Sequence, residues 1–292
     1  MRVSQALINN VVRQSSERAS RALVDAGRPI RDGTSVAAPS QDTVTANRVM
    51  ALDRFEKDFE RLDKARLQVQ TDLTSAESSI ASMHDLMVDA HTLALSMGSD
   101  AVDPRTRQEV ASQAQRYLDQ MISFANRLDA GGKYFFTGLA EDRPALSGTG
   151  AYQGNDGQRF VEVGPGMQIE ATMRGRDVFG PNNEVITSLQ NFVAALNSGD
   201  GDQIRASIDE LDGSRRILSN ARTDIGGRLG MLLEIDELSF NLKNAVQNEK
   251  ATLTQVDVAD IAPRMATAQA SLEAVVQTSQ QLMAQIGRSW LG

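Results

Sequence analysis

The 292-residue sequence contains no cysteine, so it can form neither a disulfide framework nor a thiolate metal site. Aromatic residues make up only 4% of the chain, which suits slender helix packing better than one large globular core. No apolar run reaches the length of about 18 residues that a spanning helix needs, so we expect no membrane insertion. The net charge of −8 disfavours a protein that holds phosphate backbones, and we expect no nucleic-acid partner.

The N-terminal segment, Met1 to Arg31, has no apolar core of the kind that a secretory signal needs. It is rich in arginine and serine, as transit peptides are, but Glu17 and Asp25 count against that interpretation. If the protein leaves the cytoplasm, we therefore expect a route that uses no cleaved Sec signal peptide.

The stretch from Leu52 to Met97 organises the chain, because its apolar residues recur at spacings of three and four. No proline or glycine interrupts it before Gly98, so it predicts one helix roughly 70 Å long. A helix of that length with so narrow a stripe needs equally long partner helices. Arg66 is the polar exception in a stripe made of Leu52, Phe55, Phe59, Leu62, Val69, Leu73, Ala76, Ile80, Met83, Met87, Ala90, Ala94 and Met97.

The segment before this helix has a weaker pattern. Val3, Leu7 and Val11 share one face of a predicted helix over residues 3–24, but polar side chains then occupy that face. Such a helix is marginal alone. Its glycines and prolines predict an extended or looped segment from residue 26 to residue 40.

The segment after the long helix begins with a strong start signal, in which Asp103 is followed by Pro104. An N-cap carboxylate before a proline at the first helical position is typical of a helix N-terminus. The apolar seam of this helix continues to Leu128, and Gly131 and Gly132 predict a left-handed C-cap after it. Because the turn is short, we expect this helix to fold back antiparallel on the long one.

Between Lys133 and Gly180 the glycines cluster and the apolar period falls to two. Val161 and Val163 form one alternating run, and a second run from Met167 to Met173 follows the turn residues Gly164-Pro165-Gly166. The pattern predicts a small antiparallel β-rich insertion with one buried face.

Helical spacing returns over Val185 to Leu196, breaks at Ser198 to Asp202, and then continues from Ile204 to Val256. A final helix with heptad spacing begins near Asp260. The seam after Ile204 is interrupted at Arg228, Ser239, Glu249, Gly226, Gly227 and Gly230. These glycines either weaken the helix locally or let another backbone approach.

The order of the elements predicts a mainly α fold with a small β-rich insertion. We expect an elongated antiparallel helical bundle or coiled-coil rod, with paired N- and C-terminal helices and a central β domain at the far end. The terminal helices, residues 1–40 and 257–292, have no core of their own and should be disordered in the monomer. The helical rod comprises residues 41–134 and 185–256, and residues 135–184 form the β-rich outer domain.

Candidate chemical sites are weak. His84 and His91 lie roughly 10 Å apart along one helix, too far for a single metal ion with bonds of about 2 Å, so we expect a solvated or interhelical role. Asp85 and Asp89 are interpreted as a solvated flank. The HExxH motif of metalloproteases is absent. We therefore predict no metal site, no cofactor and no catalytic residue.

Two glycine-containing motifs also have simple interpretations. Gly148, Gly150 and Gly154 miss the spacing of a GxGxxG loop, which makes a nucleotide site a remote option. Asn155-Asp156-Gly157 predicts a hairpin turn. No nucleophile, base and orienting group can be assembled from the sequence, so an enzyme is the weakest hypothesis.

Several motifs carry a resemblance to a known family. The chain opens with Met1-Arg2-Val3-Ser4, and Gly131-Gly132-Lys133-Tyr134-Phe135-Phe136-Thr137-Gly138 is similar to a Gly-Arg-Tyr-Leu-Phe-Ser-Gly signature. Residues 152–157, 163–166 and 175–180 match a central domain, and residues 222–229 and 257–260 match a C-terminal pattern. These motifs resemble the flagellin superfamily, and within it the hook-associated proteins of the hook-filament junction.

The resemblance implies an extracellular, structural axial protein of the bacterial flagellum, exported through the flagellar type III channel. It also implies self-association in a short ring between a neighbouring hook-associated protein and flagellin, and an export chaperone that binds the C-terminal region. The seams agree with this, since terminal helices covered by neighbours would build the inner wall of a tube through heterologous contacts. The expected subunit-interface residues are Val3, Leu7, Val11, Ile261, Met265, Leu272, Val275, Leu282 and Ile286.

Two alternatives remain open at this point. A filament flagellin has similar helical ends, and the central β pattern is what argues against it. A secreted coiled-coil adhesin or effector would be unrelated to the axial structure.

Overall fold

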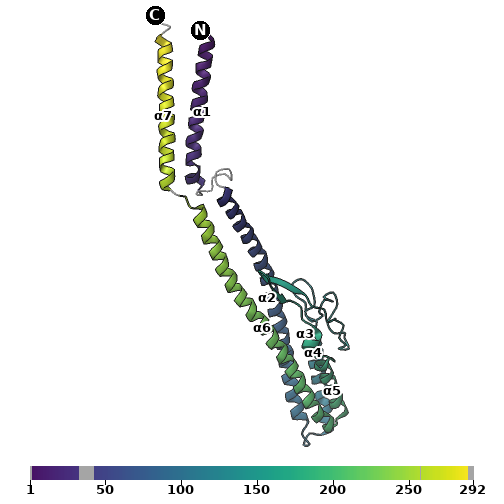
Figure 1. The fold of residues 1–292 in the computed structure, drawn as a ribbon. Helices are drawn as coiled ribbons and strands as arrows, with labels where there is room; N and C mark the ends of the chain where they lie inside the picture. Colours follow the sequence, from purple (N-terminus) through teal and green to yellow (C-terminus); the bar gives the residue numbers. More distant parts are fainter. Residues whose placement is uncertain (1, 33–42, 257, 289–292) are drawn as a thin grey trace. The chain divides into compact units, whose positions relative to one another are not determined.

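The computed structural model describes the backbone of residues 2–32, 43–256 and 258–288, and the side chains of residues 10–31, 43–256 and 258–282. The fold is mainly α with one small antiparallel sheet, as the sequence predicts (Figure 1). None of the helices in the described ranges is long and apolar enough to cross a membrane. The elements are α1 (Arg2–Asp32), α2 (Thr43–Met97), α3 (Pro104–Ala125), β1 (Phe160–Gly164), β2 (Met167–Glu170), α4 (Gly175–Phe179), α5 (Glu184–Ser198), α6 (Gly201–Thr254) and α7 (Val258–Arg288).

The chain divides into two compact units, each of which is built from both halves of the sequence. Unit 1 combines Met1–Lys57 with Leu242–Gly292, and unit 2 is Asp58–Asn241. Helices α2 and α6 each contribute to both units. The three-part division expected from the sequence uses other boundaries and stays a prediction.

Unit 1 contains the paired N- and C-terminal helices. Helices α1 and α7 lie side by side and antiparallel, as expected (Figure 1). In the same unit, charged side chains join the first turns of α2 to the end of α6. The Lys250 ammonium lies 2.6 Å from a carboxylate oxygen of Asp53 and 2.7 Å from one of Glu56. The hydrogen bond to Asp53 contributes most to raising the pKa of Lys250, and the one to Glu56 contributes next. The Arg48 guanidinium, 2.6 Å from Glu249, lowers the pKa of that carboxyl.

Helix α1 is longer than the sequence predicts. The loop expected from residue 26 is wrong for residues 26–32, because the helix continues through Gly27 and Pro29 to Asp32. This part of α1 runs alongside α7, and an added Cβ at Gly27 would lie 3.7 Å from the Met265 methyl group. Helix packing therefore overrides the weak local propensity. The rest of the expected loop, residues 33–40, lies outside the described residues.

Unit 2 buries the apolar stripe of α2 from Phe59 to Ala94, which confirms the prediction for this part, whereas Phe55, which lies before unit 2, is 51% exposed. Leu73, Ile80, Met83 and Met87 are fully buried or nearly so. The same core takes side chains from α3, α5 and α6 and from the insertion, among them Met121, Phe192, Leu196, Leu211, Leu218, Ile225 and Phe136. In this unit the seam finds its partners within the chain.

Helix α3 starts where the sequence predicts. An oxygen of the Asp103 side chain accepts hydrogen bonds from the backbone N–H groups of Arg105 (3.0 Å) and Thr106 (3.1 Å). The predicted C-cap at Gly131 and Gly132 is wrong, because α3 already ends at Ala125. The side-chain amide of Asn126 exchanges two hydrogen bonds with the backbone of Leu146, at 2.8 and 2.9 Å, which draws the chain out of the helix.

The predicted β-rich insertion contains one hairpin, formed by β1 and β2 across Pro165-Gly166. The alternation holds, since Val163 and Ile169 are buried. No hairpin forms at Asn155-Asp156-Gly157, so that prediction is wrong. The Asn155 side-chain oxygen instead accepts hydrogen bonds from the N–H groups of Leu139 and Gly157, both at 2.9 Å, and holds this loop against the preceding one.

The glycines of α6 do not admit another backbone. A Cβ added at Gly226, Gly227 or Gly230 would meet nothing within 4 Å, and the helix continues through all three. The suggestion of a close backbone approach is therefore wrong.

Buried arginines explain why the seams contain polar residues. Arg66 of α2 donates to the Val163 carbonyl and to the Ser239 hydroxyl, both at 3.2 Å, and lies 2.7 Å from Asp63 and from Asp236. This arginine and its four partners, which we call the Arg66 clasp, fasten the hairpin to both long helices.

Two more arginines act in the same way. Arg228 of α6 donates to the backbone carbonyls of Glu170 and Thr172, at 3.2 and 3.1 Å, at the end of β2. Arg107 of α3 is buried and donates to the carbonyls of Met97, Ser99 and Gly199, at 3.1, 2.9 and 2.9 Å. Each guanidinium satisfies backbone groups at a place where regular helix or sheet pairing ends.

Replacing Arg66 by alanine should lower the free energy of unfolding of the protein by about 2 to 3 kcal/mol, since a buried carbonyl and hydroxyl lose their donor and two carboxylates lose their cation. Arg61→Ala is the matched control, because Arg61 is exposed and lies 3.9 Å from its nearest carboxylate, Glu162. The Arg61→Ala change should lower the free energy of unfolding by less than about 1 kcal/mol. Urea unfolding followed by circular dichroism measures both, and equal effects of the two variants would contradict the clasp.

Candidate assembly interface

Helix α7 places its predicted seam on the side that meets α1. Ile261 is buried, and Met265, Leu272, Val275 and Leu282 are half-buried. The residues between them are mostly exposed. The residues at heptad spacing are thus the ones that face α1. Helix α1 alone buries them only in part.

Helix α1 presents a matching but narrower face. Ala19 is buried, and Val12, Leu23 and Ala26 are half-buried at helical spacing. Small side chains such as Ala19 and Ala26 let two helices approach, but they add little apolar area to the contact. In unit 1 the two terminal helices therefore pair without forming an extensive core.

The nine interface residues expected from the sequence fall into three groups. Met265, Leu272, Val275 and Leu282 are half-buried against α1, with Ile261 buried at the start of α7. Val11 lies off the face that meets α7 and is 55% exposed. The side chains of Val3, Leu7 and Ile286 lie outside the described residues. For all nine residues, the role as subunit contacts stays a prediction.

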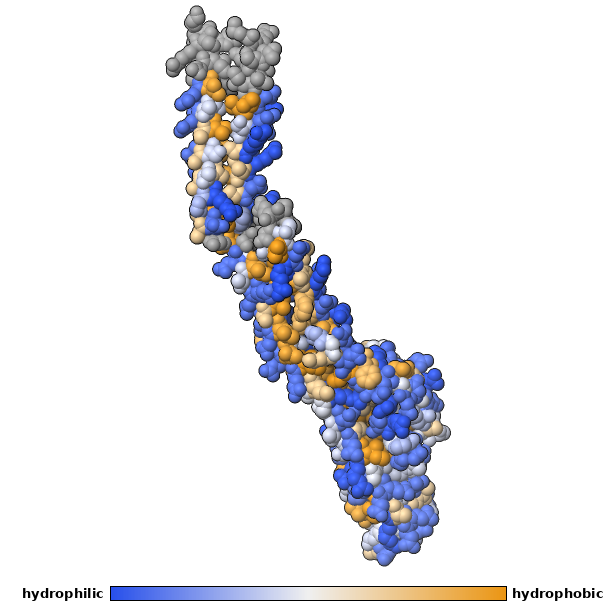
Figure 2. Space-filling model, in the orientation of Figure 1, coloured by the Kyte–Doolittle hydropathy of each residue, from blue (hydrophilic) through white to orange (hydrophobic). Residues whose placement is uncertain are grey.

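Other apolar residues of the pair are exposed and were missed by the sequence analysis. Val24 and Ile30 of α1 and Val258 and Val276 of α7 flank the paired faces and remain exposed. Figure 2 shows apolar side chains at the surface along these helices. Ile30 was missed because Pro29 predicted a loop, Val24 because the apolar pattern of the first helix is weak, and Val276 because it lies beside the heptad seam of α7.

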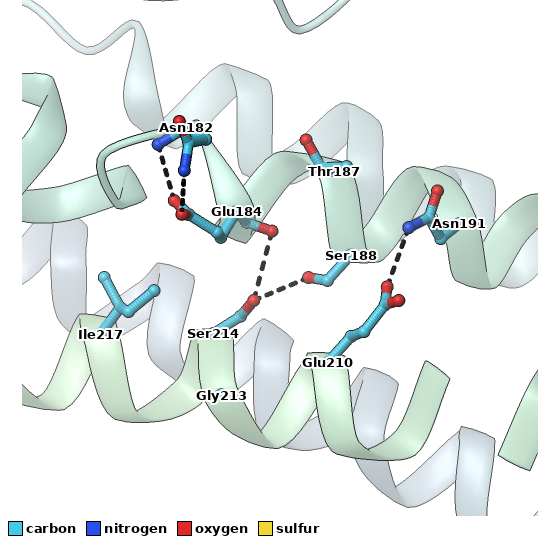
Figure 3. A pocket seen from close by; sticks show the side chains of 9 residues that line it. All are labelled: Asn182, Glu184, Thr187, Ser188, Asn191, Glu210, Gly213, Ser214 and Ile217. Carbon is cyan, nitrogen blue, oxygen red and sulfur yellow. Dashed lines mark hydrogen bonds between the residues drawn. The ribbon is translucent and has the colours of Figure 1, made fainter. Parts of the chain in front are cut away.

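A groove between α5 and α6 has a volume of about 430 Å³. Its polar side chains bond to one another (Figure 3). The Asn182 side chain donates to Glu184 at 3.0 Å, Asn191 donates to Glu210 at 2.8 Å, and the hydroxyls of Ser188 and Ser214 lie 2.8 Å apart. These hydrogen bonds occupy donors and acceptors of the lining, so we do not assign the groove as a ligand site.

The two histidines lie half-buried on one side of α2. The Nδ1 atom of His84 is 3.6 Å from the Asp85 carboxylate. The pKa of the Asp212 carboxyl of α6 is lowered chiefly by its hydrogen bond from Arg215 and least by the charge of His91, so His91 lies within electrostatic reach of α6. Among the residues that the structure describes, no three histidine, aspartate or glutamate side chains gather as they would around a metal ion.

Comparison with known proteins agrees with this arrangement. Flagellar hook-associated protein 3 of Salmonella typhimurium is 24% identical over 277 residues, which covers 86% of this chain and 87% of that protein. The protein of the same name from Escherichia coli is 22% identical over 256 residues, with 79% and 81% covered. The chain is a relative of flagellar hook-associated protein 3. No family model matches the sequence.

Solved structures of hook-associated proteins share the fold. A putative flagellar hook-associated protein from Vibrio parahaemolyticus superimposes with a TM-score of 0.67 at 20% identity, covering 74% of this chain and all of that one. The flagellar junction protein FlgL from Legionella pneumophila gives a TM-score of 0.58 at 13% identity, covering 73% of this chain and 100% of that one. These solved hook-associated proteins therefore share the fold of this chain over about three quarters of its length.

Leu272→Asp and Leu282→Asp should each block assembly, because a charge on the half-buried seam opposes burial worth about 1.5 to 3 kcal/mol per leucine. Unit 2 should still fold, since both residues belong to unit 1. Motility of a strain carrying each variant, together with circular dichroism of the purified chain, measures the two effects.

Gln277→Asp is the matched control, since Gln277 is an exposed residue of the same helix. It should leave motility unchanged. Normal motility of both leucine variants would show that the seam is not an interface.

Proposed function

We infer that this chain is a structural axial protein of the bacterial flagellum that joins the hook to the filament. Its relatives are structural flagellar proteins, named as hook-associated protein 3 and as a flagellar junction protein. Similarity over 86% of the chain is the observation that supports this function most directly, because a match of that length extends well beyond the terminal helices. The mechanism is mechanical coupling through packed helices, and the chain lies in the flagellum on the outside of the cell.

The two alternatives are less well supported. The relatives carry the name of a hook-associated protein and not that of a filament flagellin, and the hairpin lies in the insertion that argued against flagellin at the start. A secreted adhesin or effector unrelated to the axial structure would not explain similarity to flagellar proteins over most of the sequence.

The finer features are part of the proposal. Copies of the chain form a short ring through heterologous contacts of α1 and α7, between a neighbouring hook-associated protein and flagellin. Half-buried seams and exposed apolar flanks on both helices support this, because two helices leave apolar surface that further helices can cover. The chain reaches its place through the flagellar type III export channel without a cleaved Sec signal, and a chaperone covers the C-terminal region before export.

Deleting the gene should leave cells with hooks but without attached filaments, and flagellin should appear in the medium. Electron micrographs and immunoblots of the medium measure this. Tagged protein should form one focus per flagellum at the base of the filament. Labelling along the whole filament would favour flagellin, and normal motility of the deletion strain would favour a secreted protein unrelated to the flagellum.

Limited proteolysis of the dilute purified chain should remove approximately the first 40 and the last 35 residues before it cuts unit 2. The terminal seams are half-exposed in a single chain, whereas the α2 stripe is buried. Mass spectrometry of the early fragments identifies the cut sites. Protection of both ends in the dilute monomer would contradict the expectation that neighbours order them.

A further inference from the structure

Unit 2 exposes three large apolar side chains around the Arg66 clasp. Leu67 of α2 and Leu233 and Phe240 of α6 are each between 60 and 64% exposed. Scattered apolar residues are normal on a protein surface, but a group of them marks a contact site. We call these three residues the clasp patch.

The clasp places the three residues together. One nitrogen of Arg66 binds both Asp63 of α2 and Asp236 of α6, at 2.7 Å each, so these two carboxylates meet. Leu67 lies one turn after Asp63 on α2. On α6, Leu233 and Phe240 lie one turn before and one turn after Asp236. The patch therefore spans both long helices around an ion pair that opens to solvent.

A second apolar group, the hairpin patch, lies beside the β-hairpin. Met231 and Leu238 of α6 flank Ile235 in the same helical row, and both are exposed. A Cβ added at Gly164 of the hairpin would lie 3.0 Å from Ile235, so this row runs alongside the hairpin. Met167, the first residue of β2, is also exposed and lies close to Gly164. Met231, Leu238 and Met167 make up the hairpin patch.

The two patches lie on opposite sides of α6 at the same level. At 3.6 residues per turn, Leu233 and Phe240 point roughly 140° to 160° away from Ile235 and the hairpin. Leu233 and Phe240 alternate in sequence with Met231 and Leu238, so the two patches lie at the same height along α6. In Figure 2, apolar surface lies close to where the hairpin meets α6.

An exposed charged residue lies at the edge of each patch, and the two residues are opposite in sign. Asp236, at the clasp patch, has a side chain that is 67% exposed. Arg61 of α2 lies on the hairpin side, 64% exposed, and comes no closer than 3.9 Å to the Glu162 carboxylate of β1. Complementary charges at the edge of a contact fix its register and exclude wrong partners.

We propose that the clasp patch of one copy of this chain docks on the hairpin patch of the next copy, with Asp236 facing Arg61 across the contact. The two patches differ and lie at the same height along α6, so the contact can repeat from copy to copy and close into a ring. A self-complementary patch would give only a dimer. The inference rests on the proposed ring and adds a second contact, in unit 2, to that of the terminal helices. A patch of this size forms a weak contact, so it acts when the subunits are already assembled.

The absence of native cysteine allows a direct test by cross-linking in purified flagella. Chains carrying both Phe240→Cys and Leu238→Cys, or both Leu233→Cys and Met231→Cys, should give a ladder of dimers and larger multimers with oxidant or a short bis-maleimide. Each single variant should stay monomeric on a denaturing gel, because a heterologous contact never brings the same residue of two copies together. Dimers from a single variant would show a self-complementary contact and would overturn the proposal.

A second measurement separates this inference from the proposed function. Phe240→Asp should reduce retention of the protein at the base of the filament and weaken filament attachment, while Leu95→Asp, at an exposed apolar residue outside both patches, should not. If the double-cysteine chains remain monomeric in flagella of motile cells with the protein at the junction, the contact is wrong and the function stands. If the protein is absent from the junction, the proposed function fails first.

Discussion

A helix that is apolar along one stripe is stable only where another element covers the stripe. Unit 2 meets this requirement within the chain, because α3, α5, α6 and the insertion together cover the stripe of α2. Unit 1 meets it only in part, since α1 and α7 cover each other from one side and leave the seam residues of α7 half-buried. The stripe of unit 2 therefore needs no cover from another molecule. The half-covered stripe of unit 1 is the one that we assign to assembly.

The polar residues on the seams belong to the same design. Arg66 and Arg228 stand where a purely apolar stripe would have aliphatic side chains, and both donate to backbone carbonyls of the hairpin strands or the residues next to them. A buried guanidinium is stable there because it meets several acceptors. The interruptions thus position the hairpin on the long helices, and with it the surface that we propose as a second contact. Glu249, further along α6, bonds instead to Arg48 of α2.

The helices and the hairpin could be predicted from the sequence because each depends on a local signal. Apolar spacing indicates α2 and α7, Asp103-Pro104 indicates the start of α3, and Pro165-Gly166 indicates the hairpin turn. The errors came where a distant contact decides the local structure. Neither the pairing of Asn126 with Leu146 nor the interaction of Asn155 with Leu139 has a signature in the nearby sequence. The α7 face of the candidate interface was visible as a heptad, whereas the clasp patch was not, because its members come together only when Arg66 joins two helices.

We propose that neighbouring subunits cover the seam of the terminal helices. A cysteine placed at Val275, on the seam, and another at Gln277, on the exposed side of α7, would report this directly in a chain without native cysteine. We expect a maleimide to label both positions rapidly in the purified chain, and only the cysteine at position 275 to become protected in purified flagella. Equally rapid labelling of both positions in flagella would contradict it.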